Sequence, residues 1–298
     1  MRPPILSVIV CTYNRSFWMR NCLESLVEQC RDESRVEVLI VDNNSTDDTR
    51  TVAEEYTARL PNFRYLLEQV QGLSHGRNRG YREARGELVA YIDDDARAHP
   101  DWVISIIRFF EIHPQVTGVG GPYNAFSTVS IPDWFPSEYG RRSLGSETRA
   151  IRDNEWISGT NMIFRKQALE EIGGFDTGLG MAGNKISYGE ETNLVRRMRA
   201  NGMQIYYCPT IVVDHVIMPY KLSLRWLLQS NYSNGKDGVK TFEYKGNAIT
   251  YLPALIRGLL LVPVKFFTCN ERYFKTRIYR SVSQLYWQLG FFVKLLES

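Results

Sequence analysis

Residues 87–102, ELVAYIDDDARAHPDW, place three consecutive aspartates directly after an apolar run. The run at residues 88–92 predicts a buried strand, and Pro100 is typical of the first turn of a helix. The aspartates at residues 93–95 therefore stand at the end of a strand. Neighbouring carboxylates repel one another, and burying them unpaired is costly, so the cluster requires either open water or a cation. A solvated turn and a cation site are the two possible interpretations, and the sequence around this stretch is the evidence that distinguishes them.

Segments with the pattern of strands and helices alternate along the first 120 residues or so. Apolar runs predict strands at residues 5–10, 36–41, 63–67 and 88–92, and helical spacing predicts helices after Asn14, at residues 73–85 and at residues 100–112. Strands that alternate with helices form right-handed crossovers, so we expect an α/β fold with a largely parallel sheet.

Polar clusters follow three of these predicted strands. They are Thr12-Tyr13-Asn14-Arg15, Asp42-Asn43-Asn44 and Asp93-Asp94-Asp95. Ligands of a parallel sheet bind at the carboxyl ends of its strands, so we expect the three clusters to converge there. The first cluster contains no glycine, whereas a dinucleotide-binding fold needs a glycine-rich turn after its first strand. A nicotinamide or flavin dinucleotide is therefore a poor candidate ligand.

The second half of the chain begins with an irregular segment at residues 122–155. We expect a long loop over the site there, because structureless loops of this length in compact domains are usually functional or disordered. Regular patterns then return. They predict a short helix near residues 166–172, a helix that begins at Glu190, and strands at residues 204–208 and 211–214.

Eight short motifs, in this order, resemble those of the inverting glycosyltransferases of family 2, which have the GT-A fold. Besides the three polar clusters, the last of which is followed by Pro100-Asp101-Trp102, they are Gly72-Leu73-Ser74-His75-Gly76-Arg77-Asn78-Arg79-Gly80, Ser158-Gly159-Thr160-Asn161-Met162, Gly173-Gly174-Phe175-Asp176, Gly189-Glu190-Glu191 and Val212-Val213-Asp214-His215. The family commonly has Glu-Asp where this chain has Glu190-Glu191. The resemblance extends over residues 5–216.

The resemblance implies a GT-A catalytic domain at residues 1–216, with a mostly parallel central sheet in an α/β/α sandwich. It implies transfer of a sugar, with inversion, from a uridine or deoxythymidine diphosphate sugar to an acceptor hydroxyl. By position, the nucleotide-sugar contacts of the family correspond to Thr12, Tyr13, Asn14, Arg15, Asp42, Asn44, Arg77, Asn78, Asp93 and Asp94. Thr12 and Asp42 would hold the base and the ribose.

The metal site of the family corresponds to the aspartate cluster. Mn²⁺ and Mg²⁺ bind carboxylate oxygens and can offset the negative charge that builds on a departing diphosphate. We expect Asp95 as a direct ligand, and either Asp93 or Asp94 turned toward the ribose. Asp93 is the second candidate ligand, and the imidazole of His215 could complete the shell or contact the diphosphate. A solvated turn and an ordinary packed histidine stay open as alternatives.

Glu190 and Glu191 begin a predicted helix, where the helix dipole favours an ionised carboxylate. Ordinary first-turn acidity is one explanation of this pair. The other is catalytic: Glu191, with Glu190 as the second candidate, would accept the proton of the acceptor hydroxyl as that hydroxyl attacks the anomeric carbon.

The C-terminal region, residues 217–298, is basic and apolar. Residues 216–298 hold 12 Lys and Arg against 4 Asp and Glu. Helices that combine apolar runs with cations are typical of an anionic membrane surface, and the acceptor would then be a glycan or a lipid-linked molecule in polysaccharide assembly. Pro253, Arg257 and Pro263 interrupt the longest run, so we expect no spanning helix. A soluble helical subdomain is the open alternative.

Composition narrows the class of protein further. The five cysteines form no CxxC pair, which is typical of a reducing compartment. The segment that follows Met1-Arg2-Pro3-Pro4 has no signal-peptide cleavage pattern. Together these observations predict a cytoplasmic protein, free or peripheral on the inner face of the plasma membrane. Cations that lie among apolar runs make nucleic acid a poor partner. A nucleotidyltransferase is a second candidate, but its glycine-rich basic loop is missing. A non-catalytic nucleotide-sugar-binding module is the third, and the intact acidic motifs argue against it.

Overall fold

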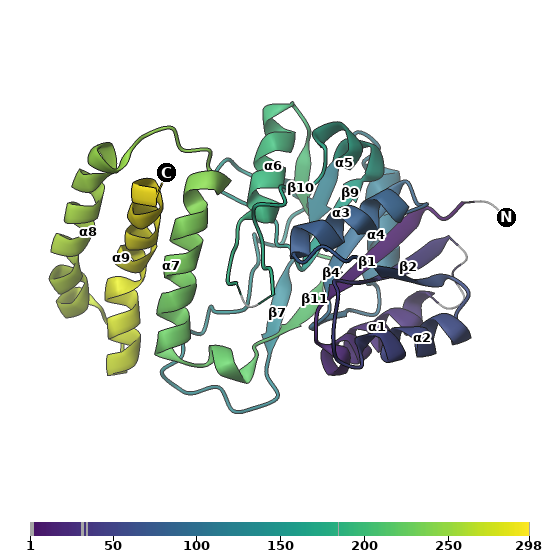
Figure 1. The fold of residues 1–298 in the computed structure, drawn as a ribbon, viewed down its shortest axis with the longest axis horizontal. Helices are drawn as coiled ribbons and strands as arrows, with labels where there is room; N and C mark the ends of the chain where they lie inside the picture. Colours follow the sequence, from purple (N-terminus) through teal and green to yellow (C-terminus); the bar gives the residue numbers. More distant parts are fainter. Residues whose placement is uncertain (1–2, 31–32, 34, 184, 298) are drawn as a thin grey trace. The chain divides into compact units, whose positions relative to one another are not determined.

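The strand ahead of the aspartate cluster is β4, Leu88–Asp93, and it lies within an eight-stranded sheet (Figure 1). The computed structural model describes residues 3–30, 33, 35–183 and 185–297, so Met1 and Arg2 of the leading segment lie outside it. The strand order is β3-β2-β1-β4-β9-β6-β10-β8. The other strands are β1 Leu6–Thr12, β2 Val36–Asp42, β3 Phe63–Leu67, β6 Gly118–Gly120, β8 Arg149–Ala150, β9 Asn161–Arg165 and β10 Ile205–Tyr207.

Most neighbouring strands of this sheet are parallel, as the sequence predicts. β1 is parallel to β2 and β4, β2 is parallel to β3, and β6 is parallel to β10. The exceptions are β9, antiparallel to β4 and β6, and β8, antiparallel to β10. The register pairs Thr12 with Asp42 and Cys11 with Asp93. The polar clusters therefore begin at one edge of the sheet.

Helices cover both faces of the sheet, because successive side chains of a strand point to opposite faces. Val8 and Val10 of β1 belong to a core cluster with residues of α1, Ser16–Cys30, α2, Thr49–Arg59, and α4, Trp102–Ile112. Ile9 belongs to a second cluster with residues of α3, Leu73–Glu83, α5, Lys166–Ile172, and α6, Glu190–Ala200. The result is the expected α/β/α sandwich.

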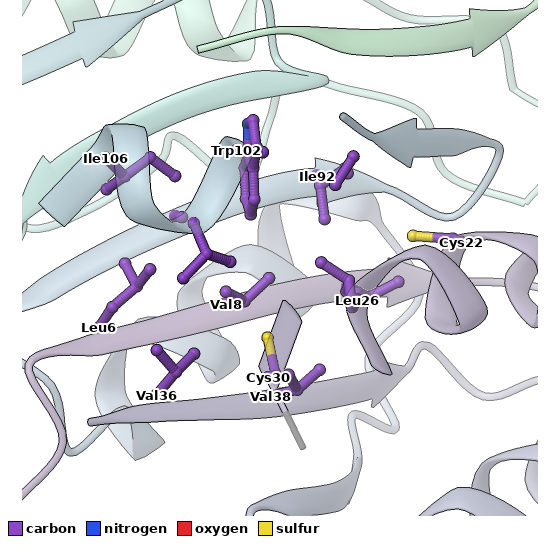
Figure 2. Packing of buried hydrophobic residues seen from close by; sticks show 14 of the residues in the cluster. Leu6, Val8, Cys22, Leu26, Cys30, Val36, Val38, Ile92, Trp102 and Ile106 are labelled. Atoms are coloured by element: carbon purple, nitrogen blue, oxygen red, sulfur yellow. The ribbon is translucent and has the colours of Figure 1, made fainter. Parts of the chain in front are cut away.

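Figure 2 shows the first of these clusters, in which Leu26 of α1 and Trp102 of α4 lie with Val8 among fully buried side chains. Burying an aliphatic side chain stabilises a fold by about 1.5–3 kcal/mol. The Trp102 indole also needs a hydrogen-bond partner, and its Nε1 donates to Asn161 Oδ1 at 3.0 Å. This packing holds β4 and β9 beside each other, and β4 ends at the aspartate cluster.

A second, three-stranded sheet has the order β5-β11-β7, with β5 Ala96–Ala98, β11 Val213–Val216 and β7 Tyr123–Phe126. The prediction of an irregular loop at residues 122–155 is therefore wrong at two places, since β7 and β8 lie within it. These strands have four and two residues, which is too short for a period-two pattern to be read from sequence.

The chain divides into two compact units. The first consists of residues up to Phe126, Gly140–Gly178 and Glu191–Val216, and the second of Ser127–Tyr139, Leu179–Glu190 and the residues from Ile217 onward. The second unit contains the 3₁₀ turn η1, Pro219–Lys221, and the helices α7 Leu224–Thr241, α8 Ala248–Thr268 and α9 Phe274–Glu297. Two segments that precede residue 216 thus group with the C-terminal helices. Arg280 of α9, for example, forms an ion pair with Glu138.

Helix α8 corrects one expectation about the C-terminal region. The sequence suggests that Pro253 and Pro263 divide its apolar run, yet one helix of 21 residues continues through both. By length and composition alone, this helix is long and apolar enough to cross a membrane. Each proline removes one backbone donor, but packing against α9 outweighs that loss, because tertiary contacts supply most of the stability of a helix.

Candidate functional site

The carboxyl ends of β1, β2 and β4 hold the predicted polar residues. Asp42 is buried, and both of its oxygens accept hydrogen bonds, Oδ1 from the Ser45 amide at 2.9 Å and Oδ2 from the Tyr65 hydroxyl at 2.9 Å. Burial, together with the bond to Asp42, raises the pKa of Tyr65 to about 12, so the phenol remains a donor. A carboxylate has about four lone-pair sites, so Asp42 can still accept from a ligand.

The turn after β1 is joined to the turn after β2 through Asn14. Its side-chain Oδ1 accepts a hydrogen bond from the backbone N–H of Thr46 at 2.7 Å, and its backbone N–H donates to Ser45 Oγ at 2.9 Å. Asn14 and Asn44 both have positive φ, at 51° and 64°, a conformation that asparagine tolerates better than most residues. Tyr13 is half-buried in the same turn. Thr12, Tyr13, Asn14, Asp42 and Asn44 thus belong to one edge.

Arg15 joins this edge to the aspartate cluster. Its Nη1 lies 3.1 Å from Asp94 Oδ1 and 2.9 Å from Asp95 Oδ2. Both aspartates are buried. Burial raises the pKa of Asp94 to about 6, although the charge of Arg15 acts in the opposite direction. The guanidinium therefore compensates two like charges that have little access to water.

Arg77 of α3 also contacts the cluster, at Asp93. This side chain is buried, its Nη2 lies 3.3 Å from Asp93 Oδ1, and its guanidinium lies over the Phe175 ring at 5.5 Å. The same nitrogen donates to the carbonyl oxygen of Gly159 at 3.4 Å. A Cβ on Gly159 would lie 2.7 Å from that nitrogen, so only glycine leaves room for Arg77 in this position.

Asn78, the neighbour of Arg77, is used differently. Its Nδ2 donates to the Phe175 carbonyl at 2.9 Å, and its Oδ1 accepts from the Phe175 amide at 2.8 Å. Both side-chain groups therefore hold the Gly173-Gly174-Phe175-Asp176 turn. The resemblance implies a place near the nucleotide for Asn78, and its two hydrogen bonds hold the backbone of Phe175, the residue whose ring Arg77 covers.

His215 of β11 completes a group with the two outer aspartates. Its Nε2 lies 3.0 Å from Asp95 Oδ1 and 3.9 Å from Asp93 Oδ2, and one ligand atom from each residue lies within 4.8 Å of the others. Strand pairing creates this proximity, since His215 is opposite Ala96 and the Val216 amide donates to the Asp95 carbonyl. Two carboxylates and an imidazole are donors that fit a divalent cation such as Mn²⁺.

Tyr123 and Arg142 lie beside this group, and the sequence does not single them out. The Tyr123 ring meets the His215 imidazole edge-on, with centroids 6.0 Å apart. Burial raises the pKa of Tyr123, Arg142 lowers it, and Glu191 and Asp93 raise it further, so all three charges act on one phenol. Tyr123 and Arg142 also exchange backbone hydrogen bonds. Both residues lie far from any motif, so only this backbone pairing places them at the site.

Arg142 in turn lies over the exposed ring of Trp156, with its guanidinium carbon 3.7 Å from the ring centroid. Its Nε donates to the Trp156 carbonyl at 3.1 Å.

The two candidate bases lie in different surroundings. Glu191 acts on the same Tyr123 phenol as Asp93 and Arg142, so it shares their electrostatic environment. Glu190, at the first position of α6, is buried and contributes to raising the pKa of Tyr188 in the second unit.

Comparison with known proteins agrees with this geometry. Residues 7–173 match the profile of glycosyl transferase family 2. A glucosyl-dolichyl phosphate glucuronosyltransferase of Haloferax volcanii is 27% identical over 239 residues, which are 77% of this chain and 75% of the relative. The fold is similar to the mannosyltransferase PcManGT from Pyrobaculum calidifontis, solved with GDP-Man and Mn²⁺, with a TM-score of 0.66 and 18% identity over 99% of this chain and 88% of that one.

A second solved structure, S. aureus TarS residues 1–349 in complex with UDP-GlcNAc, has a TM-score of 0.59 and 17% identity, over 98% of this chain and 90% of that one. At these identities, the two structures show the GT-A fold and nothing more. The profile match covers more than half of the chain, and it includes the strand ends that carry the aspartate cluster. The chain therefore belongs to glycosyl transferase family 2 and is a glycosyltransferase.

Proposed function

We propose that this enzyme transfers a sugar from a nucleoside diphosphate sugar to an acceptor hydroxyl with inversion at the anomeric carbon. The observation that carries the proposal is the grouping of Asp93, Asp95 and His215 at a sheet edge that also holds Thr12 and Asp42. A nucleoside diphosphate needs polar partners for base and ribose and a cation for its phosphates. This edge offers both within one compact unit.

The base and ribose would lie against the turns after β1 and β2. Asp42 would accept from a pyrimidine N–H or a ribose hydroxyl, because its position is fixed by Ser45 and Tyr65 while lone pairs remain. Thr12 and Asn14 line the same turns. This arrangement supports a uridine or deoxythymidine diphosphate donor. Asp94, held by Arg15, would contact the ribose.

A divalent cation would be held by Asp93, Asp95 and His215. When bound, such an ion offsets the negative charge that builds on the departing diphosphate. Carboxylates suit both Mg²⁺ and Mn²⁺, but an imidazole donor favours the transition metal. We therefore propose Mn²⁺ ahead of Mg²⁺. Arg77, ion-paired to Asp93, fixes the orientation of that carboxylate.

Glu191 would act as the general base. Its carboxylate would accept the proton of the acceptor hydroxyl as the oxygen attacks the anomeric carbon from the face opposite the diphosphate. Its electrostatic influence on Tyr123, which contacts His215, supports a place close to the cation site. Trp156 offers an exposed ring for a sugar face of the acceptor.

The acceptor would be a glycan or a lipid-linked molecule, with the enzyme peripheral on the inner face of the membrane. The relative named for a dolichyl phosphate substrate and the basic, apolar C-terminal helices both support this proposal. Residues 1–216 would then form the catalytic domain and residues 217–298 the membrane-facing region.

Thermal stability tests the donor and cation sites together. Binding to the native state raises the unfolding midpoint, so the wild type should be stabilised by a UDP or dTDP sugar rather than by a GDP sugar, and only with Mn²⁺. Asp95→Asn should lose this shift, whereas Asp101→Asn, an exposed aspartate nearby, should keep it. An Mn²⁺-independent shift, or one that survives in Asp95→Asn, would reject the cation site.

Transfer assays test the base. Glu191→Gln should bind the donor normally and lose activity by about 10²–10⁴-fold, the usual contribution of a general base. Glu190→Gln is the matched control on the same helix and should retain more activity. If the two variants exchange these outcomes, Glu190 is the base. If both stay fully active, another residue removes the proton.

A further inference from the structure

The outer face of α8 is a continuous stripe of exposed apolar side chains. Ile249 and Phe267, near the two ends of the helix, are each 81% exposed, and Leu260 between them is 69% exposed. The remaining large members of the stripe are Leu252, Ile256, Leu259 and Val264. Their spacing of three or four residues places them on one side of a helix. Across the described part of the helix, no residue is buried.

The opposite face of α8 is already occupied by α9. The tilted rings of Tyr251 and Phe291 lie with their centroids 4.6 Å apart, and Lys265 Nζ donates to Gln284 Oε1 at 2.6 Å. A Cβ on Gly258 would lie 1.8 Å from Gln288 Oε1, so the two helices approach each other closely there. Figure 1 shows α9 between α7 and α8. The stripe is thus a second apolar face, and the second unit does not use it.

We propose that this stripe of α8 binds an anionic lipid surface, with the helix lying in the plane of the membrane. The inference rests on the proposed membrane contact and assigns that contact to one helix face. Exposed apolar stripes of this length are uncommon on proteins without a binding role. A lipid surface accepts the apolar side chains below the headgroups and pairs the flanking cations with phosphates.

The positive charge around α8 favours an anionic lipid surface as the partner of the stripe. Residues 244–275 contain the five cations Lys245, Arg257, Lys265, Arg272 and Lys275 and only one carboxylate, Glu271. Arg257 comes directly after Ile256, and successive residues of a helix are rotated by about 100° around its axis. Arg257 therefore lies at the edge of the apolar stripe. α8 itself contains no Asp or Glu. A second copy of the chain, docked stripe to stripe, would bring against Arg257 another α8, which holds no carboxylate, whereas anionic headgroups provide a partner.

The polar neighbours of α8 favour an in-plane helix over a spanning one. A short connection after Thr268 leads from α8 into α9, which runs along α8. Beyond this connection, α9 carries the polar residues Arg277, Arg280, Gln284 and Gln288. Arg280 is ion-paired to Glu138 and Glu271. If α8 crossed the bilayer, these polar groups would enter the hydrocarbon beside it or lose their partners, and both are costly. An in-plane helix buries the stripe alone.

Vesicle co-sedimentation of the full chain tests the assignment. Wild type should bind phosphatidylcholine vesicles that contain phosphatidylglycerol, bind pure phosphatidylcholine more weakly, and lose part of its affinity in high salt. Ile256→Glu/Leu260→Glu should lower the partition coefficient by about a hundredfold or more, because two apolar anchors are replaced by charges. Ile112→Glu on α4, where the isoleucine is 71% exposed, is the matched control and should bind as wild type does.

Three results would overturn the inference. Binding by the stripe variant equal to that of wild type would move the membrane contact elsewhere on the chain. No binding by wild type would reject the membrane contact itself. Dimers in light scattering that become monomers in the stripe variant would assign the stripe to a second copy. Donor-dependent thermal stabilisation, measured on the same samples, shows independently whether the proposed catalytic site is intact and whether the variants are folded.

Depth-dependent quenching separates an in-plane helix from a spanning one. Ile249→Trp, Ile256→Trp and Phe267→Trp place a fluorophore at the two ends and the middle of the stripe. Relative to wild type, lipids brominated near the headgroup should quench the added fluorescence at all three positions. Stronger quenching of the position-256 variant by bromines near the chain ends, with shallow quenching at the other two positions, would show a spanning helix and reject the in-plane orientation.

Discussion

Arg15 places a single guanidinium nitrogen between Asp94 and Asp95, at 3.1 and 2.9 Å from their nearest oxygens. The same Asp95 carboxylate contacts His215 through its other oxygen at 3.0 Å. Asp94 and Asp95 are therefore not part of a solvated turn. They are buried and charge-compensated, and an arginine from one strand end and a histidine from another sheet share the Asp95 carboxylate, while Asp93 beside them stays partly exposed.

Removal of Arg15 should destabilise the fold. In Arg15→Gln, the two buried carboxylates lose their cation, and we expect a loss of about 1–3 kcal/mol in the free energy of unfolding, less than for a fully buried pair because the arginine is partly exposed. Urea denaturation measures it. The control is Arg20→Gln, whose partner Glu55 is as exposed as Arg20 itself, and which should cost less than about 1 kcal/mol. Equal losses in both variants would contradict the compensating role of Arg15.

His215→Ala should weaken the cation site. Removing one of three donors should raise the Mn²⁺ concentration needed for half-maximal thermal stabilisation, in the presence of donor, by about tenfold or more. His99→Ala is the comparison, because His99 lies 3.2 Å from Asp214 on the half-exposed side of β11 and outside the ligand group. Unchanged Mn²⁺ dependence in His215→Ala would mean that the histidine is only a packing residue.

Gly159→Ala should act through Arg77. The new Cβ would lie 2.7 Å from the guanidinium, which must then move away from Asp93. We expect donor affinity in the presence of Mn²⁺ to fall by about tenfold, which titration calorimetry can measure. Gly76→Ala on α3 places its Cβ at 3.4 Å from Cys11 Sγ and should be tolerated. A donor affinity equal to that of wild type would show that Arg77 does not orient the aspartate.

The Arg149–Glu155 ion pair should make stability depend on pH. Arg149 lowers the pKa of Glu155 from 4.5 to about 2. A carboxyl with a lowered folded-state pKa contributes stability above its unfolded value, and that contribution disappears as the pH falls from about 4.5 toward 2. The difference in thermal midpoint between wild type and Glu155→Gln should therefore be full at pH 7 and shrink below about pH 4.5. Glu171→Gln, an exposed glutamate on α5, should show no such trend.

Much of this site could be predicted because its residues follow directly after strands. The apolar runs locate β1, β2 and β4, and a parallel sheet brings their polar ends to one edge without further information. Motif order was sufficient for the family. The roles of Asn78 and Trp102 were not readable, because a buried amide or indole is defined by the partner it meets, here Phe175 and Asn161.

By itself, the sequence determined the alternation of strands and helices, the edge at which polar residues gather, and the identity of the candidate ligands. Tertiary structure alone decided which of those ligands meet. His215 reaches Asp95 only because β11 pairs with β5, two segments more than a hundred residues apart in the chain. Tyr123 and Arg142 join them through a backbone pairing that no local pattern encodes. Local pattern specifies which face a side chain occupies, whereas long-range strand pairing specifies its neighbour.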